Sequence, residues 1–146
     1  MINDTLPVVG KLSLVLRDEY GNIKQQIDKD NLVVTVGKNF LANAVLASSS
    51  SPFTHMAIGT NGTAATLADT TLGTEIARSA FTTSSRTNNV VTLSTTYGAG
   101  TGTGALQEAG IFNASSAGTL LSHVVFSVIN KGSADSLSIT WTITVG

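Results

Sequence analysis

The stretch from Leu137 to Val145, LSITWTITV, alternates apolar residues with serine or threonine without an exception. Successive side chains of a β-strand point to opposite faces, so the apolar residues, Trp141 among them, share one face. A strand of this kind is half-buried, with its apolar face toward a core. The stretch therefore predicts a protein built on antiparallel sheets, with Trp141 on the core side of one of them.

Eight further stretches predict short strands separated by turn residues. The first two form a hairpin around residues 18–22, DEYGN, whose Gly and Asn suit a short loop. The second strand of that hairpin carries a lysine and two glutamines, which is typical of an edge strand. All nine predicted strands span residues 12–17, 23–27, 32–36, 53–58, 78–85, 90–97, 106–112, 120–128 and 137–145.

One helix is predicted, over about residues 38–47, after Gly37 ends the preceding strand. Phe40, Leu41, Ala44 and Val45 fall on one helical face. The helix ends in a serine run closed by a proline, which cannot continue it. Many short strands with one short helix predict a mainly β fold, an antiparallel β-sandwich or jelly-roll-like domain. Periodicity alone leaves sandwich and barrel open.

The 146 residues suit one domain with a real core. Residues 1–10 lack periodicity and contain Pro7, so they predict an extended N-terminal arm, with a single β-sandwich domain over 11–146. The start of the chain lacks a signal-peptide pattern, and no apolar run approaches the roughly 18 residues of a membrane span. We therefore expect a protein made in a cytoplasm, without a membrane partner.

The segment from Met56 to Arg78, MAIGTNGTAATLADTTLGTEIAR, contains a long loop without bulky side chains. An apolar strand enters the loop, and the chain returns at Leu72 to Ile76. Such a loop has little apolar surface to bury and much backbone freedom to lose on folding. We expect it to be ordered only where other parts of the molecule hold it.

Charge is scarce and unevenly placed. Charged residues are 12% of the chain, against about 25% in ordinary globular domains. Eight of the seventeen lie between Arg17 and Lys38, and only seven lie in the 108 residues from Asn39 onward. A net charge of −1 gives no electrostatic footprint for nucleic acid. Interface cores are depleted in charge, so the neutral surface predicts contacts with copies of the chain or with partners, although a neutral β-protein with few charges is the simpler alternative.

The two histidines, His55 and His123, are a weak metal signal because no third ligand stands near either of them. Strand alternation places His123 on one face with Leu121 and Val125. We expect a packed or interface histidine. If His123 lies between subunits, association would weaken when the ring takes up a proton.

The acidic residues do not predict a catalytic or metal site. Asp18, Glu19, Asp28 and Asp30 match no calcium loop and are expected to be solvated turn residues. Glu75 and Glu108 would suit a glycosidase pair only if the fold brought them together.

The remaining motifs are equally poor in chemistry. The glycine runs at 59–62 and 98–104 lack the context of a phosphate-binding loop, and the serines have no nucleophile elbow. The chain has no cysteine. We therefore predict no catalytic, cofactor-binding or metal-binding residue, no cofactor and no enzymatic activity.

Several segments, in their order and spacing, resemble small virion structural proteins of tailed bacteriophages, of the capsid decoration (cement) type, with similarity also to phage tail and fibre modules. The segment at 32–39 resembles the part that precedes the helix in such proteins. The other segments that carry the resemblance are 57–60 with 71–78, 106–114, 118–121 with 124–131, and 137–145.

The resemblance implies a phage structural protein whose partners are the major capsid protein and itself, as a homotrimer, on the exterior of the capsid. The small size, the N-terminal arm and the neutral body favour the decoration type over a fibre. On this interpretation the arm at 1–10 reaches a neighbour or the shell, and the Thr-rich strand faces make the self-contact. The alternative is a tail or tail-fibre tip module that contacts a host glycan or receptor through the loops at 61–70 and 98–104.

Overall fold

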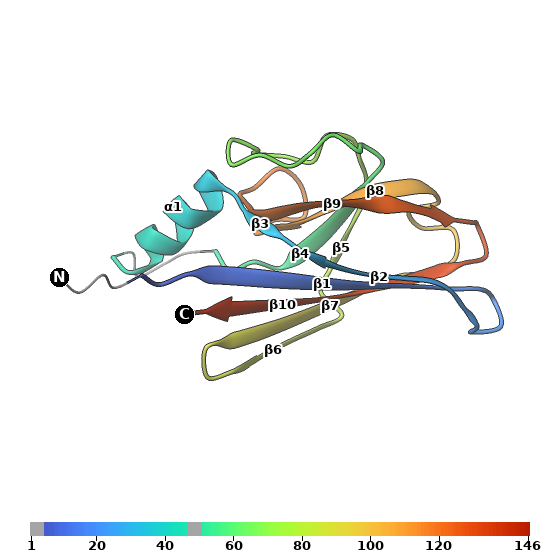
Figure 1. Ribbon diagram of the computed structural model, residues 1–146, viewed down its shortest axis with the longest axis horizontal. Helices are drawn as coiled ribbons and strands as arrows, with labels where there is room; N and C mark the ends of the chain where they lie inside the picture. Colours follow the sequence, from blue (N-terminus) through green and yellow to red (C-terminus); the bar gives the residue numbers. More distant parts are fainter. Residues whose placement is uncertain (1–4, 47–50) are drawn as a thin grey trace.

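The computed structural model of the protein describes residues 5–46 and 51–146. Ten strands form two five-stranded antiparallel sheets that pack face to face, with one short helix at one end (Figure 1). The predicted fold class is confirmed, because the domain is a β-sandwich. The two separate sheets also decide the choice between sandwich and barrel that periodicity left open.

Sheet A contains the stretch that predicts the fold, as its central strand. Its order is β2-β1-β10-β7-β6, with bounds β1 Val8–Arg17, β2 Ile23–Asp30, β6 Thr83–Thr87, β7 Val90–Tyr97 and β10 Ser136–Val145. Trp141 of β10 lies opposite Leu12 of β1 and Leu93 of β7, so the inward residues of three strands form one row.

Sheet B provides the other half of the core and carries the helix. Its order is β3-β9-β8-β4-β5, with bounds β3 Leu32–Val33, β4 His55–Gly59, β5 Glu75–Ala80, β8 Gly104–Phe112 and β9 Leu120–Lys131. Helix α1, Thr35–Ala44, follows β3 and packs on β9.

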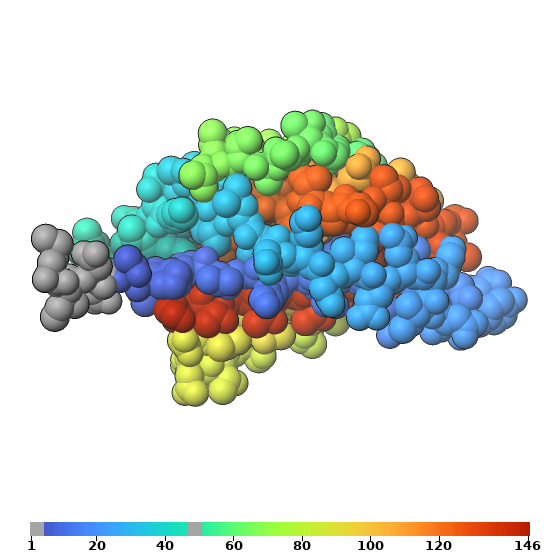
Figure 2. All heavy atoms as spheres, viewed as in Figure 1, coloured from blue at the N-terminus to red at the C-terminus, as the bar shows by residue number. Residues whose placement is uncertain are grey.

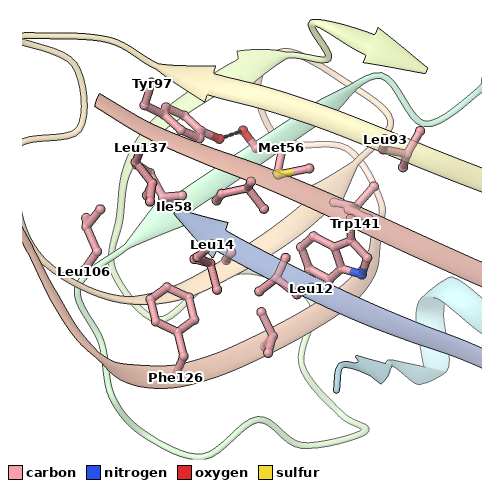
Figure 3. Packing of buried hydrophobic residues seen from close by; sticks show 14 of the residues in the cluster. Leu12, Leu14, Met56, Ile58, Leu93, Tyr97, Leu106, Phe126, Leu137 and Trp141 are labelled. Atoms are coloured by element: carbon pink, nitrogen blue, oxygen red, sulfur yellow. Dashed lines mark hydrogen bonds between the residues drawn. The ribbon is translucent and has the colours of Figure 1, made fainter. Parts of the chain in front are cut away.

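The main core lies between the sheets and consists almost entirely of aliphatic and aromatic side chains (Figure 3). Trp141 and Tyr97 are its largest fully buried members, as the alternation of β10 predicts for Trp141. The Tyr97 hydroxyl donates a hydrogen bond to the carbonyl of Met56 in the opposite sheet. Burial raises the pKa of Tyr97, so the hydroxyl keeps its proton and this tie between the sheets.

A second, smaller core lies on the outer side of sheet B. Its buried members are Val34, Ala57, Leu72, Phe112 and Leu120. Leu72 comes from the loop between β4 and β5, which runs over the strands of sheet B as a third layer (Figures 1 and 2). The long loop of the Met56–Arg78 segment therefore covers one face of the sandwich.

The helix begins three residues earlier than predicted. The sequence assigns residues 32–36 to a strand and 38–47 to the helix, whereas β3 ends at Val33 and α1 starts at Thr35. Gly37 does not separate the two elements but lies inside the helix, buried against the backbone of Leu121. The predicted end of the helix at residue 47 lies outside the described residues.

The single strand predicted at 78–85 is wrong, because the chain changes sheets there. Strand β5 ends at Ala80 in sheet B, and β6 starts at Thr83 in sheet A. The Phe81 amide donates to Thr54 beside sheet B, and the next amide, that of Thr82, donates to Ser94 of sheet A. Two residues thus make the crossing, and alternation alone does not reveal it.

The predicted boundary between arm and domain, at residues 10 and 11, falls inside β1. Val8 already pairs with Val145, and Gly10 with Ile143. The Pro7 carbonyl accepts a hydrogen bond from the amide of Gly146. The C-terminal end of the chain therefore holds the N-terminal segment in place from Pro7 onward. Of the predicted arm, residues 1–4 lie outside the described residues.

The position of Gly37 yields a stability prediction. A Cβ atom there would lie 2.4 Å from the Leu121 carbonyl oxygen, so Gly37→Ala forces α1 away from β9. We expect a loss of about 2 kcal/mol in the free energy of unfolding, measured by urea titration. Gly98→Ala is the control, because nothing lies within 4 Å of a Cβ there and the change is expected to stay within about 0.5 kcal/mol. Equal effects of the two substitutions would contradict the packing of α1.

Candidate functional site

The carboxylate of Glu108 holds both ends of the loop at residues 60–74. Glu108 lies on β8 and is 0% exposed. Its Oε1 accepts the amides of Thr74 at 2.7 Å and Asn61 at 3.3 Å, and its Oε2 accepts the amide of Gly73 at 2.8 Å. One buried side chain therefore gathers backbone donors from the start and the end of the loop.

A histidine links this carboxylate to a second one. His123 of β9 is 4% exposed, with its Nε2 2.9 Å from Glu108 Oε2 and its Nδ1 2.7 Å from Asp69 Oδ2. Asp69 lies in the middle of the loop, where it also accepts the amide and the hydroxyl of Thr66. We call Glu108, His123 and Asp69 the Glu108 clasp, because the three residues connect the middle of the loop to the sheet beneath it.

The clasp depends on charge at its loop end. Burial raises the pKa of Asp69, but the hydrogen bonds from Thr66 and His123 outweigh it and hold the pKa below its ordinary value of 3.8. An ionised carboxylate accepts hydrogen bonds through both oxygens, whereas a protonated one carries a donor of its own. The loop end of the clasp is therefore complete when Asp69 is ionised.

Further contacts fix the rest of the loop. Leu72 packs in the second core, and the Thr35 amide at the start of α1 donates to the Leu67 carbonyl at 2.9 Å. The Thr60 amide donates to Thr74 at 3.0 Å and closes the base of the loop. A cavity of about 360 Å³ remains between the loop and the clasp, lined by loop residues 61–73 together with Glu108 and His123. The composition of the loop predicts that other parts of the molecule must hold it, and these contacts do so.

The clasp holds structure together rather than assembling a nucleophile and a base. Both nitrogens of His123 face carboxylate oxygens, so neither is left to take a proton from a hydroxyl. The oxygens of Glu108 are occupied by three backbone amides and the ring. The described contacts of the three side chains are therefore with the loop and with one another.

The other predicted carboxylate, Glu75, belongs to a separate cluster. Glu75 and Glu108 lie on either side of Gly59 in the register, but each has its own partner. Glu75 accepts two hydrogen bonds from Arg78, at 2.7 and 2.8 Å. The guanidinium of Arg78 stacks 3.7 Å from the ring of Phe112 and donates to the carbonyls of Ala114 and Ala117. The geometry gives a second tie, here for the loop between β8 and β9.

The glycine run at 98–104, predicted to be a flexible connector, is held by a buried lysine. Lys131 donates to the Gly98 carbonyl at 2.9 Å, and the Gly100 amide donates to Ser133. Burial lowers the pKa of Lys131, and the nearby Asp135 opposes this effect. The hydrogen bond from Lys24, at 2.7 Å, lowers the pKa of Asp135. Positive φ angles at Gly100 and Gly102 explain the glycines of this turn.

The remaining candidate residues behave as ordinary structural groups. Asp18 accepts the amides of Tyr20 and Asn22 in the β1–β2 turn, and the hydrogen bond from Asn22 is the main cause that lowers its pKa. Asp28 lies opposite Ser13 on the edge strand β2. His55 has its Nδ1 2.7 Å from the hydroxyl of Thr54 and takes no part in the clasp.

Strand parity is right for Val125 and wrong for Leu121. The register is continuous from Val125 to His123, so these two share a face as predicted, but Leu121 packs in the main core while His123 joins Glu108 under the loop. The cause is a bulge: Ile111 pairs with Ser122 and Phe112 with Leu120, so Leu121 is the extra residue. The sequence does identify a packed histidine and a dependent loop, but it gives no signal that Glu108, 15 positions away, faces the same ring.

Comparison of the chain with protein-family models, curated proteins and solved structures gave no match. Within the described part of the chain, no helix is long and apolar enough to cross a membrane. Residues 5–46 and 51–146 contain no group of three or more His, Cys, Asp or Glu placed to hold a metal ion. The role of the clasp is therefore inferred from its own contacts.

Replacing Glu108 tests the clasp directly. In Glu108→Gln the side chain keeps its shape, but one oxygen becomes an NH₂ group that faces backbone donors or the ring. We expect a loss of about 2–4 kcal/mol in the free energy of unfolding, because buried donors lose their acceptor. Hydrogen exchange at the amides of Gly73 and Thr74 should accelerate at the same time.

Gln107→Ala is the matched control on the same strand. Gln107 makes one long hydrogen bond, 3.4 Å, to the Thr60 carbonyl, so its removal should cost less than about 1 kcal/mol and leave the exchange at Gly73 and Thr74 unchanged. A Glu108→Gln protein with wild-type exchange rates at those two amides would contradict the clasp.

The clasp also predicts an acid limit for the order of the loop. The folded-state pKa of Asp69 is depressed, so its stabilising contribution is complete above the ordinary value of 3.8 and is lost as the pH falls through the lower folded value. We expect amide protection in residues 60–74 to decrease as the pH falls through the folded-state pKa of Asp69, measured by hydrogen exchange after correction for intrinsic exchange.

The variant Asp69→Asn tests this limit. It should abolish the acid-side loss of protection and leave the exchange of core amides on β10 unchanged. A wild-type loop that loses no more protection in acid than the loop of Asp69→Asn would show that the Asp69 carboxylate does not hold the loop.

Proposed function

We propose that the protein is a capsid decoration (cement) protein of a tailed bacteriophage. It would bind the outer surface of the shell and tie neighbouring capsid subunits together, with the major capsid protein and copies of itself, as a homotrimer, for partners. The resemblance of the segments at 57–60 with 71–78 and at 106–114 supports the proposal, as does the neutral surface of the chain. The fold is compatible with many functions and does not decide among them.

The observation that carries the proposal is an exposed apolar groove at one end of the sandwich. The start of β1, the C-terminus and α1 lie at this end, and the β1–β2 turn lies at the other (Figure 1). The groove encloses about 810 Å³ and is lined mainly by the N-terminal segment and α1. Leu6 and Val45 of its lining are 72% and 84% exposed, and Leu46, which follows Val45 in the chain, is 88% exposed. Clustered exposed apolar residues on a small protein are typical of a docking surface.

The position of the groove agrees with an arm that reaches a neighbour. Leu6 and Pro7 line it just before β1 begins, and Lys38 is the one charged residue among the described residues of the lining. Neutral apolar contact of this size is weak for one copy. Repeated over a closed shell it would be strengthened by multivalency, which raises the effective affinity without any new contact.

Copy number tests the proposal. Particles purified from the phage that carries this protein should contain hundreds of copies per virion by quantitative mass spectrometry, comparable with the major capsid protein. A handful to a few dozen copies would instead favour the alternative, a tail or tail-fibre tip module that contacts the host surface. Absence from the particle would overturn both.

The groove can be tested separately with a surface variant. Val45→Ser with Leu46→Ser removes two exposed apolar side chains, so folding should be affected by less than about 1 kcal/mol. Binding to shells stripped of the protein should fall at least about tenfold, since loss of roughly 1.4 kcal/mol per contact is multiplied across the copies. Ile23→Ser is the control, because Ile23 is exposed at the opposite end. Full occupancy by the double variant would remove the groove from the proposal.

A further inference from the structure

Strand β6 is the least covered strand of the sandwich. It ends sheet A, pairs only with β7, and all five of its residues, Thr83–Thr87, are exposed. The β6–β7 hairpin projects from the body of the molecule (Figures 1 and 2). Among the described residues, no backbone hydrogen bond reaches β6 from any strand but β7. Its outer row of backbone donors and acceptors is therefore open to another strand.

The opposite edge of sheet A is protected against such pairing. Strand β2 carries four charged residues within eight, Lys24, Asp28, Lys29 and Asp30. Charges on an edge are a common means of blocking pairing between sheets. Strand β6 has only one charged residue, Arg86, and neither proline nor a bulge. The two edges thus differ in the feature that usually prevents association.

The single charge of β6 is directed back into its own hairpin. The Arg86 guanidinium donates to the Asn88 carbonyl at 2.7 Å, in the turn that leads to β7. Asn88 has a φ of 53°, as the tight hairpin turn requires. The charge is therefore engaged within the turn, and the rest of the strand offers only hydroxyl side chains and backbone.

We propose that β6 pairs with β6 of a second copy of this chain, antiparallel about a twofold axis, so that sheet A continues from one molecule into the next. Unpaired backbone groups specify another strand as the occupant, in the manner of β-augmentation. The sequence TSSRT is compatible with itself in this arrangement, because four of its five residues are neutral.

Charge selects the register. With Ser85 opposite Ser85, all five residues pair, and Arg86 of each copy lies opposite Ser84 of the other. If Arg86 were instead opposite Arg86 at the twofold axis, the two guanidinium groups would face each other directly, which is unfavourable. If Ser84 were opposite Ser84, only three residues of each strand would be paired. The Ser85-centred register is thus the one that combines full pairing with separated charges.

The β6 pairing does not depend on the proposed function, but it would specify how copies of the protein contact one another. A twofold contact cannot close a homotrimer, because three copies around a threefold axis need two different surfaces. If the protein decorates a shell as a trimer, β6 pairing would link one trimer to the next.

The test uses the cysteine-free chain, into which single cysteines can be placed cleanly. In the proposed register, residues at position 85 face each other with Cβ atoms about 4.5–5.5 Å apart, close to disulfide geometry. Ser85→Cys should form a disulfide-linked dimer under mild oxidation at least about tenfold faster than Gln26→Cys, through the higher effective concentration of the thiols. Gln26→Cys is the control on the protected edge, where Gln26 is equally exposed.

A charge variant provides a second readout that needs no cross-link. Ser85→Lys would oppose two ammonium groups, so the associated species seen by analytical ultracentrifugation of the wild type should dissociate, whereas Gln26→Lys should not change it. Circular dichroism and thermal melting of both variants verify that the fold persists.

Equal cross-linking at positions 85 and 26, or a wild-type mass that Ser85→Lys leaves unchanged, would overturn the pairing. All measurements use the isolated protein, so failure here leaves the decoration proposal standing. Loss of shell binding with intact β6 pairing would do the reverse.

Discussion

A single buried carboxylate determines whether the outer layer of this protein exists. Glu108 is withdrawn from water, which is costly for an ion unless donors replace the solvent. The loop supplies those donors through the amides of Asn61, Gly73 and Thr74, and His123 adds a fourth. The dependence is mutual, because a loop of small residues has too little apolar surface to order itself. Leu72 then completes the small core beneath it.

Much of the sandwich is predictable because its strands obey local rules. Alternation in β10 and the turn chemistry of DEYGN depend only on neighbours in sequence, and both appear as predicted. The predictions fail where tertiary contacts override a local sequence pattern. Gly37 reads as a break but is the residue that lets α1 approach β9, and the sheet change at Phe81 and Thr82 lies inside an apparently continuous strand.

The site was less accessible to sequence reasoning than the fold. The need of the loop for support follows from its composition, but the group that supplies it lies on a strand that reads as ordinary. A bulge at Leu121 breaks the alternation that would put Leu121 on the same face as His123. Contacts between residues that are distant in sequence, such as Asp69 with His123, have no local signature in a single chain. Bulges and buried ion clusters are decided by the whole fold.

The position of His123 separates the clasp from association. The ring is buried within one copy and both its nitrogens are engaged there, so it is not available as the contact between subunits that the sequence left open. The two surfaces proposed for association lie elsewhere: among the described residues the groove lining carries Lys38, and β6 carries Arg86. A change that loosens the clasp would therefore act on the order of the 60–74 loop, and a surface distant from that loop should bind its partner equally well whether the loop is ordered or loosened.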